Sequence, residues 1–164
     1  MLIGILAGSF DPIHLGHLDL INRALAARPF DKIILLPTMR NPNKPPPLAF
    51  NRRVAMVRQA LKEANLKASI SLLEQKQPGP LYTYNALLAL KKRYPNDQLQ
   101  LIMGEDSYPS IKKYMEKLNL FFEVLVLPRT NISSKIIRDN IKAGKPLVHL
   151  MPKKTAALAE KYYT

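Results

Sequence analysis

Short apolar runs alternate along the chain with longer segments in which apolar residues recur every three or four positions. The short runs predict strands over residues 2–7, 32–36, 68–72, 99–103 and 121–127. The longer segments predict helices over residues 16–27, 51–64, 82–94, 107–118, 133–144 and 153–163. Strands that alternate with helices are typical of βαβ crossover units. We therefore expect an α/β fold, a doubly wound parallel sheet with helices on both faces.

Length and composition narrow the class of protein. With 164 residues, 47% of them hydrophobic and 23% charged, the chain fits one globular domain over residues 1–164. It contains no cysteine, which excludes disulfide scaffolds, thiolate metal sites and cysteine nucleophiles. No apolar run approaches the ~20 residues of a membrane span, and the N-terminus lacks a signal-peptide pattern. We therefore expect a cytoplasmic protein.

The charge balance indicates an anionic partner. The 25 lysines and arginines outnumber the 12 aspartates and glutamates, which gives a net charge of +13 and a pI near 10.0. Such an excess suits nucleic acid, an anionic membrane surface or a polyphosphorylated small molecule, and charge alone does not separate these partners. Solubility is a further explanation of the same excess.

The loops at the carboxyl ends of the predicted strands are the expected place for a ligand site. The first of them, residues 8–17, directly follows the first strand. His14 and His17 fall on one face of the first helical turn, where Gly16 lets a ligand approach the backbone. A helix N-terminus with two imidazoles is suited to bind an anion. From the residues alone, the pair is equally explained by a helix cap or by half of a metal site with Asp11.

At this loop the sequence resembles the nucleotidylyltransferase superfamily. The H-x-G-H signature of the superfamily matches residues 14–17, and the G-[ST]-F-D-P pattern before it matches residues 8–12. The resemblance implies a Rossmann-like fold and an enzyme that joins a phosphorylated molecule to the α-phosphate of a nucleoside triphosphate. Mg²⁺ would assist and pyrophosphate would leave. The resemblance also implies that His17 stabilises the five-coordinate phosphorus while His14 and Ser9 hold phosphate oxygens.

A second matching segment lies near the other end of the chain. Residues 132–138 resemble the I-S-S-x-x-[IV]-[RK] pattern of the superfamily. Either serine is suited to cap the following helix, and Arg138, about one turn further on, can fork to phosphate oxygens. Read alone, the segment is as well explained by a capped helix with a solvated arginine. Together the two matches imply an ATP site formed by Gly8, Ser9, Phe10, His14, His17, Gly104, Asp106, Ile132, Ser133, Ser134 and Arg138.

Three further loops resemble landmarks of nicotinate-mononucleotide adenylyltransferase. Residues 42–44, 81–83 and 104–107 stand where that family has P-H-K, S-Y-T and G-A-D-S. The likeness implies that Lys44 neutralises triphosphate charge and acts with the two histidines, and that the third loop contacts the adenylate part. Each landmark also has an ordinary explanation: a solvated charge for Lys44, a helix start for the second loop and an N-cap for Asp106.

The second substrate is less closely defined by the resemblance. The backbone N–H groups of Tyr82 and Thr83 would bind the nicotinate carboxylate at a helix N-terminus. Tyr114 stands where the family has a tryptophan that stacks on the pyridine ring, Asn43 replaces a histidine, and the connection 129–132 is shorter than usual. The substrate-binding residues implied are Ser9, Lys44, Tyr82, Thr83 and Tyr114.

These observations predict an adenylyltransferase that transfers AMP from ATP to nicotinate or nicotinamide mononucleotide in NAD biosynthesis. Phosphopantetheine adenylyltransferase is an alternative, because residues 16–20 resemble that enzyme well. A non-catalytic basic nucleic-acid-binding module is a second alternative, although the aromatic content of 7% forms no RNA-stacking motif. We expect small-molecule substrates, no nucleic acid or membrane partner, no resident protein metal site and a homo-oligomer as an option. His149 receives no role.

Overall fold

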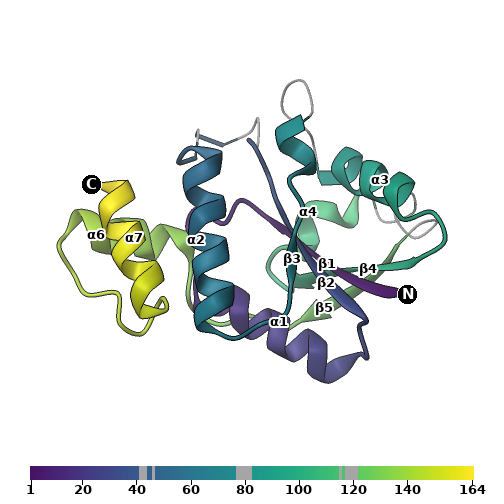
Figure 1. Ribbon diagram of the computed structural model, residues 1–164, viewed down its shortest axis with the longest axis horizontal. Helices are drawn as coiled ribbons and strands as arrows, with labels where there is room; N and C mark the ends of the chain where they lie inside the picture. Colours follow the sequence, from purple (N-terminus) through teal and green to yellow (C-terminus); the bar gives the residue numbers. More distant parts are fainter. Residues whose placement is uncertain (41–43, 46, 77–82, 115, 117–121) are drawn as a thin grey trace.

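The computed structural model has a parallel sheet at its centre (Figure 1). It describes residues 1–164 except 41–43, 46, 77–82, 115 and 117–121. The strands are β1 (Leu2–Gly8), β2 (Lys32–Pro37), β3 (Ser69–Ile70), β4 (Gln98–Gly104) and β5 (Glu123–Leu127). They form one five-stranded sheet in the order β3-β2-β1-β4-β5, with every neighbouring pair parallel. The chain therefore winds outward in one direction from β1, then returns to β4 on the other side of it.

Helices cover both faces of this sheet. They are α1 (Leu15–Ala27), α2 (Phe50–Glu63), α3 (Thr83–Arg93), α4 (Tyr108–Lys112), α6 (Ser134–Lys142) and α7 (Lys153–Tyr163), with a short 3-10 helix, η1 (Leu73–Lys76). One hydrophobic core lies between the sheet and α1, α2, α6 and α7, and the other lies between the sheet and α3 and α4. In Figure 1, α6 and α7 lie beside α2 at one end of the molecule. The doubly wound architecture expected from the sequence is confirmed.

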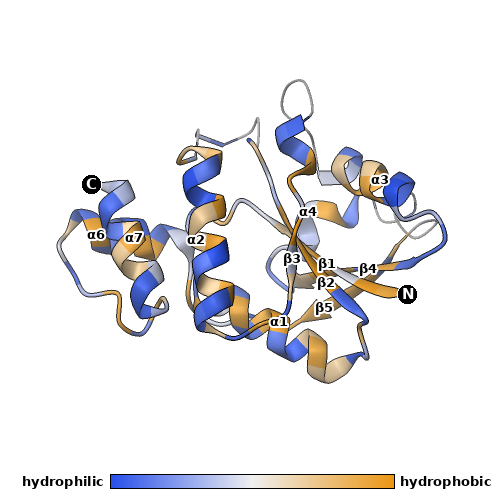
Figure 2. Cartoon of the chain, in the orientation of Figure 1, coloured by the Kyte–Doolittle hydropathy of each residue, from blue (hydrophilic) through white to orange (hydrophobic). Residues whose placement is uncertain are grey.

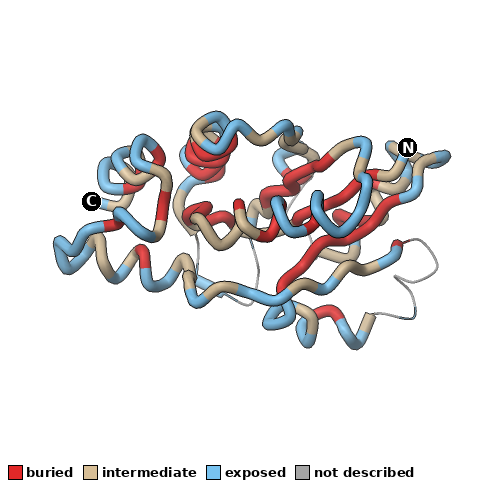
Figure 3. Tube along the Cα trace, turned by 90° about the horizontal axis from the view of Figure 1, so that it is seen from below, coloured by how far each residue is buried: buried red, intermediate tan, exposed pale blue. Residues whose placement is uncertain are grey.

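The alternation of side chains along the strands explains why one sheet needs two helical layers. In β2, Ile33 and Leu35 belong to one core, whereas Ile34 and Leu36 belong to the other. All four side chains are at most 2% exposed, and burial of each stabilises the fold by about 1.5–3 kcal/mol. The strands accordingly appear as apolar ribbons in Figure 2 and as the buried centre of the molecule in Figure 3.

Two predicted elements are much shorter than the sequence pattern suggested, and smaller differences occur at the ends of others, such as β5, which begins at Glu123. The strand predicted over 68–72 is reduced to β3, which lies at the edge of the described sheet and pairs with β2. The helix predicted over 107–118 ends as α4 at Lys112, because the N–H of Tyr114 donates to the carbonyl of Ile111 and tightens the chain into a turn. Residues 115, 117 and 118 of that prediction lie outside the described part of the chain.

The ends of α6 follow the capping chemistry expected from the sequence. The Ser133 hydroxyl accepts a hydrogen bond from the N–H of Ile136 at 3.2 Å, and Gly144 lies just beyond the helix with φ of +63°. Helix α7 spans the predicted residues, Lys153–Tyr163. Across the described ranges of the chain, no helix has the length and apolar character needed to cross a membrane.

Candidate active site

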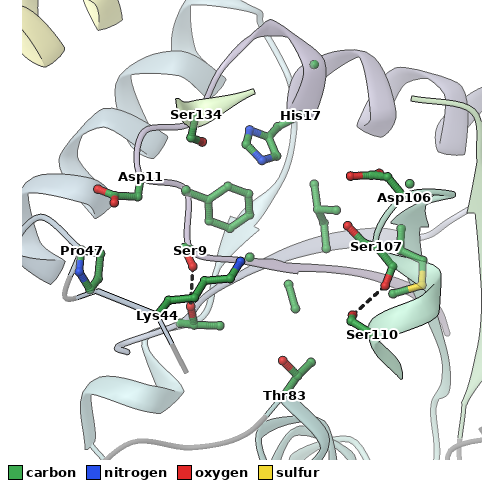
Figure 4. A pocket seen from close by; sticks show the side chains of 18 of the residues that line it. Ser9, Asp11, His17, Lys44, Pro47, Thr83, Asp106, Ser107, Ser110 and Ser134 are labelled. Carbon is green, nitrogen blue, oxygen red and sulfur yellow. Dashed lines mark hydrogen bonds between the residues drawn. The ribbon is translucent and has the colours of Figure 1, made fainter. Parts of the chain in front are cut away.

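A cavity of about 1260 Å³ lies at the carboxyl ends of β1 and β4, where the strand order reverses. Gly8 at the end of β1 and Gly104 at the end of β4 both line it. The other predicted residues that line it are Ser9, Phe10, His14, His17, Lys44, Thr83, Tyr114, Asp106, Ser134 and Arg138. In Figure 4, His17 and Ser134 lie at one end of the cavity, Thr83 lies at the other, and Lys44 extends between them.

The two histidines form a reciprocal cap at the start of α1. The Nδ1 of His14 accepts a hydrogen bond from the N–H of Gly16 at 3.1 Å, and the Nδ1 of His17 accepts one from the N–H of His14 at 3.2 Å. This is the geometry of a capping box with imidazoles in place of the usual hydroxyl and carboxyl groups. The helix cap that the sequence left as an alternative is therefore present, and it also holds both rings at the cavity.

The cap fixes the protonation of both imidazoles. Because each Nδ1 accepts a hydrogen bond, each ring carries its proton on Nε2. Burial, with a smaller effect of the Arg129 charge, lowers the pKa of His14 from 6.5 to about 4. Burial and the neighbouring His14 also lower the pKa of His17 well below its usual value. Both rings are thus neutral donors at pH 7, and the buried Nε2 of His14 has no hydrogen-bond partner among the described residues.

Close packing holds the first loop against these rings. The buried Phe10 has φ of +47°, a left-handed conformation that a bulky residue rarely adopts, and its ring meets His17 edge-on at 5.0 Å. A Cβ at Gly16 would lie 2.7 Å from Thr130 Oγ1 and 3.0 Å from His14 Nδ1. Glycine at this position therefore avoids a steric clash with both side chains.

The segment far downstream meets the first loop at this cavity. The Ser134 hydroxyl donates to the carbonyl of Pro12 at 2.9 Å, and Nη1 of Arg138 donates to the carbonyl of Asp11 at 2.6 Å. These contacts join residues that are more than 100 positions apart in the sequence. The two segments that the superfamily resemblance singled out therefore face one cavity.

Two predicted ATP-site residues do not line the cavity. Ser133 is the N-cap of α6, and its hydroxyl is engaged by the N–H of Ile136. Ile132 packs instead against the hydrophobic core between the sheet and α1, α2, α6 and α7. The spacing of the motif could not separate these roles, because consecutive residues at a helix start point in different directions. Tyr82, a predicted substrate-binding residue, lies outside the described residues.

Arg129 is a cavity residue that the sequence reasoning missed. Its guanidinium forms an ion pair with Asp106 and also donates to the carbonyl of Ile132 at 3.3 Å. Asp106 is therefore engaged by an arginine rather than serving as the N-cap of α4, a position that Ser107 occupies. In the sequence, Arg129 could have been identified as a cavity residue by its position. It directly follows Pro128, which ends the last predicted strand, and so lies at the carboxyl edge of the sheet.

Arg53 is a second residue that the sequence did not identify, and it joins the loops that border the cavity. Its fully buried guanidinium donates to the carbonyls of Leu48, Ser9, Thr38 and Met39 at 2.5–3.0 Å. One side chain from α2 thus ties the loop after β1 to the loop after β2. The Thr38 hydroxyl adds a contact to Ser9 Oγ at 3.4 Å, drawn as a dashed line in Figure 4.

The far end of the cavity carries an aromatic wall. The rings of Tyr114 and Tyr84 stack with centroids 6.0 Å apart, and both residues line the cavity together with Thr83 at the start of α3. The ammonium of Lys113 lies 4.8 Å from the centre of the Tyr114 ring. Tyr84 was not identified from the sequence, because at helical spacing a tyrosine has the same pattern as a core residue.

The donor set fits a metal ion that is carried by a nucleotide. The residues that the structure describes include no group of three or more histidine, aspartate or glutamate side chains placed to hold a metal. Mg²⁺ usually keeps several waters and takes its remaining ligands from substrate phosphates and one or two carboxylates. Asp11 and Asp106 both line the cavity, and each is already engaged by neighbouring side chains.

Comparison with known proteins assigns the chain to a family. A family model described as Cytidylyltransferase-like matches residues 5–155. The chain belongs to the cytidylyltransferase-like family. The match runs from within β1 to the first residues of α7, and so includes both segments that meet at the cavity.

Relatives of this cytidylyltransferase-like chain share a name. The nicotinate-nucleotide adenylyltransferase of Bacillus subtilis is 33% identical to it over 96% of the chain and 95% of the relative. The probable nicotinate-nucleotide adenylyltransferase of Thermus thermophilus is 30% identical over 99% and 98%. The Plasmodium falciparum nicotinic acid mononucleotide adenylyltransferase complexed with NaAD has the same fold, with a TM-score of 0.77, 19% identity and coverage of 98% and 95%.

Proposed function

We propose that the protein is an adenylyltransferase that transfers AMP from ATP to nicotinate mononucleotide, in NAD biosynthesis, and releases pyrophosphate. The observation that carries the proposal is the meeting of the histidine pair and the amino end of α6 at one cavity beyond β1 and β4. The names of relatives at 30–33% identity support the choice of substrate. The net charge of +13 suits substrates that are all anionic.

In the proposed reaction the phosphate of the mononucleotide attacks the α-phosphorus of ATP in line. A new P–O bond forms, the bond from the α-phosphorus to the bridging oxygen breaks, and pyrophosphate takes the electron pair. The Nε2–H of His17 donates to the oxygens on which charge develops, and that of His14 supports it. Neutral imidazoles serve this role without transferring a proton, so catalysis depends on positioning and charge.

The remaining cavity residues divide between the two substrates. Arg138 and Ser134 at the start of α6 hold the triphosphate, and Lys44 neutralises its charge between the two substrates. Mg²⁺, bound to phosphate oxygens and water, would neutralise further charge on the triphosphate. At the far end, Thr83 lies at the amino end of α3, where backbone N–H groups suit a carboxylate, and Tyr114 provides a ring wall.

We further propose that residues 1–164 form one nucleotidylyltransferase domain that acts on small molecules in the cytoplasm. Support for one domain comes from the two cores, which share a single sheet and draw residues from Ile3 to Ala159.

The test is a direct assay of pyrophosphate release. Purified protein receives Mg²⁺ and ATP with nicotinate mononucleotide, nicotinamide mononucleotide or phosphopantetheine in parallel reactions. We expect turnover with nicotinate mononucleotide, and detection of the dinucleotide product would confirm the transfer. Turnover with phosphopantetheine alone would contradict the substrate, and salt-dependent binding of RNA or DNA without any turnover would contradict the reaction.

A further inference from the structure

The last turn of α7 reaches back to the first loop. The Tyr163 hydroxyl donates a hydrogen bond to Oδ1 of Asp11 at 2.5 Å, across 152 positions of sequence. Both residues line the cavity. Tyr163 lies beyond every segment that the sequence resemblance singled out, so neither the motifs nor the proposed reaction gives it a role.

Asp11 is shared between this tyrosine and the arginine assigned to the triphosphate. Its Oδ1 also accepts the N–H of Leu48 at 3.1 Å, whereas its Oδ2 lies 3.7 Å from Nη1 of Arg138. That distance is too long for a hydrogen bond. Nη1 of Arg138 donates instead to the backbone carbonyl of Asp11 at 2.6 Å. The arginine is therefore attached to the loop backbone while the carboxylate beside it is turned toward Tyr163.

A carboxylate and a guanidinium this close would normally form a short, charge-assisted pair, often a bidentate one. The ion pair present here is a long one, at 3.7 Å. A short pair would neutralise Arg138 more fully and hold it away from a phosphate. The two neutral donors on Oδ1 fix the orientation of the carboxylate and thereby oppose this closure. Burial, the hydrogen bond to Asp11 and the Asp11 charge raise the pKa of Tyr163, so its hydroxyl stays protonated at neutral pH and remains a donor.

We propose that Tyr163 is a positioning residue for Arg138: by engaging Oδ1 of Asp11, its hydroxyl keeps the guanidinium available for the triphosphate. The inference rests on the proposed function, specifically on the assignment of Arg138 to ATP. The affinity for ATP would then depend on the last turn of α7, which carries Tyr163. Without the hydroxyl, the Asp11 carboxylate turns toward Arg138 and competes with the phosphate oxygens.

The test starts from Tyr163→Phe, which removes the hydroxyl and keeps the ring. Loss of one such hydrogen bond corresponds to about a fivefold change, so we expect the KM for ATP to rise about 3- to 10-fold. The kcat and the KM for the mononucleotide should change less than about twofold. Tyr94→Phe is the matched control, because it also removes a bonded hydroxyl and Tyr94 is not among the cavity-lining residues.

Two double variants distinguish positioning from general stabilisation. In an Arg138→Ala background, Tyr163→Phe should leave the KM for ATP unchanged, because no guanidinium remains to be captured. In an Asp11→Asn background it should also have no effect, since the amide keeps an acceptor for Leu48 but carries no charge. If Tyr163→Phe raised the KM for ATP equally in all backgrounds, the proposal would be overturned. A fall in Tm together with a loss of kcat would also overturn it.

Failure of the proposed function gives a different result. If Arg138→Ala alone leaves the KM for ATP unchanged, Arg138 does not bind ATP. The assignment of Arg138 in the proposed function is then wrong, and so is the inference about Tyr163. If Arg138→Ala raises that KM and Tyr163→Phe does not, the ATP site stands and only the inference about Tyr163 is refuted.

Discussion

Backbone hydrogen bonds decide what each ring of the histidine pair can do. Both Nδ1 atoms are occupied by backbone N–H groups, so both rings present Nε2–H and neither is a base at the cavity. The sequence placed the two rings on one helical face but left capping and catalysis as alternatives. The structure shows that capping is present and that it orients the donors which the proposed reaction uses.

Replacement of His17 by alanine should reduce kcat by about 10²- to 10³-fold with a modest change in KM. The physical reason is that its Nε2–H contact develops mainly in the transition state. Steady-state kinetics with ATP and nicotinate mononucleotide measure both parameters. Thermal unfolding of the variant separates loss of the cap from loss of the donor, and a kcat reduced less than about tenfold in a folded variant would refute the role.

The buried His14 makes stability depend on pH. Its pKa is about 4 in the folded protein and 6.5 in the unfolded chain, so between these values the unfolded state binds the proton and the folded state does not. The free energy of unfolding should therefore fall as the pH decreases from 6.5 to 4, by about 3 kcal/mol at most from this residue. Above pH 6.5 this contribution is fully present.

Urea unfolding at several pH values measures this slope. His14→Asn keeps a capping oxygen for Gly16 but cannot titrate, so its slope below pH 6.5 should be shallower than that of the parent protein. His149→Asn is the matched control, because it makes the same substitution at an exposed histidine that does not line the cavity. Parallel slopes for the parent protein and His14→Asn would contradict the assignment.

Among the elements, α6 begins at two adjacent serines with separate tasks, the N-cap Ser133 and the first helical residue Ser134. Ser133→Ala removes the oxygen that accepts the N–H of Ile136, which should lower the free energy of unfolding by about 1 kcal/mol. It should leave the KM for ATP nearly unchanged. Ser134→Ala removes the hydroxyl at the cavity and its bond to Pro12, so it should raise that KM at a smaller cost in stability.

Each variant is the control for the other, since they remove the same atom one position apart. Urea unfolding and the KM for ATP are measured on both. If Ser133→Ala raised the KM as much as Ser134→Ala does, the prediction that Ser133 binds ATP would be supported, and the separation of the two roles would be wrong.

Elements with strong local patterns were predictable, and those set by distant contacts were not. The apolar run of β1 and the helical period of α7 gave the observed elements nearly residue for residue. The ends of α4 and β3 depend on a turn at Ile111 and on an edge position in the sheet, neither of which leaves a periodic signal. Arg53 was hidden for a related reason: its acceptors are backbone carbonyls, which no sequence motif encodes.

At the scale of the whole molecule, part of the positive charge is concentrated at the cavity. Arg129, Arg138, Lys44 and Lys135 line it, whereas Lys92 on α3 is exposed and not among the cavity-lining residues. Coulomb attraction toward ATP decays over the Debye length, about 30 Å at 0.01 M salt and about 10 Å at 0.1 M. Charges close to the cavity should therefore contribute more to ATP affinity than the net charge does.

The KM for ATP should rise between about 0.01 M and 0.1 M KCl, because salt screens attraction between the cavity and the triphosphate. Lys135→Gln removes a charge at the cavity and should make this dependence shallower. Lys92→Gln changes the net charge by the same amount and should leave it unaltered. Assays at fixed free Mg²⁺ measure the slope of log KM against log salt for the three proteins. If the two variants reduced the slope equally, net charge rather than the placement of lysines at the cavity would govern ATP binding, and the local account of electrostatics would be wrong.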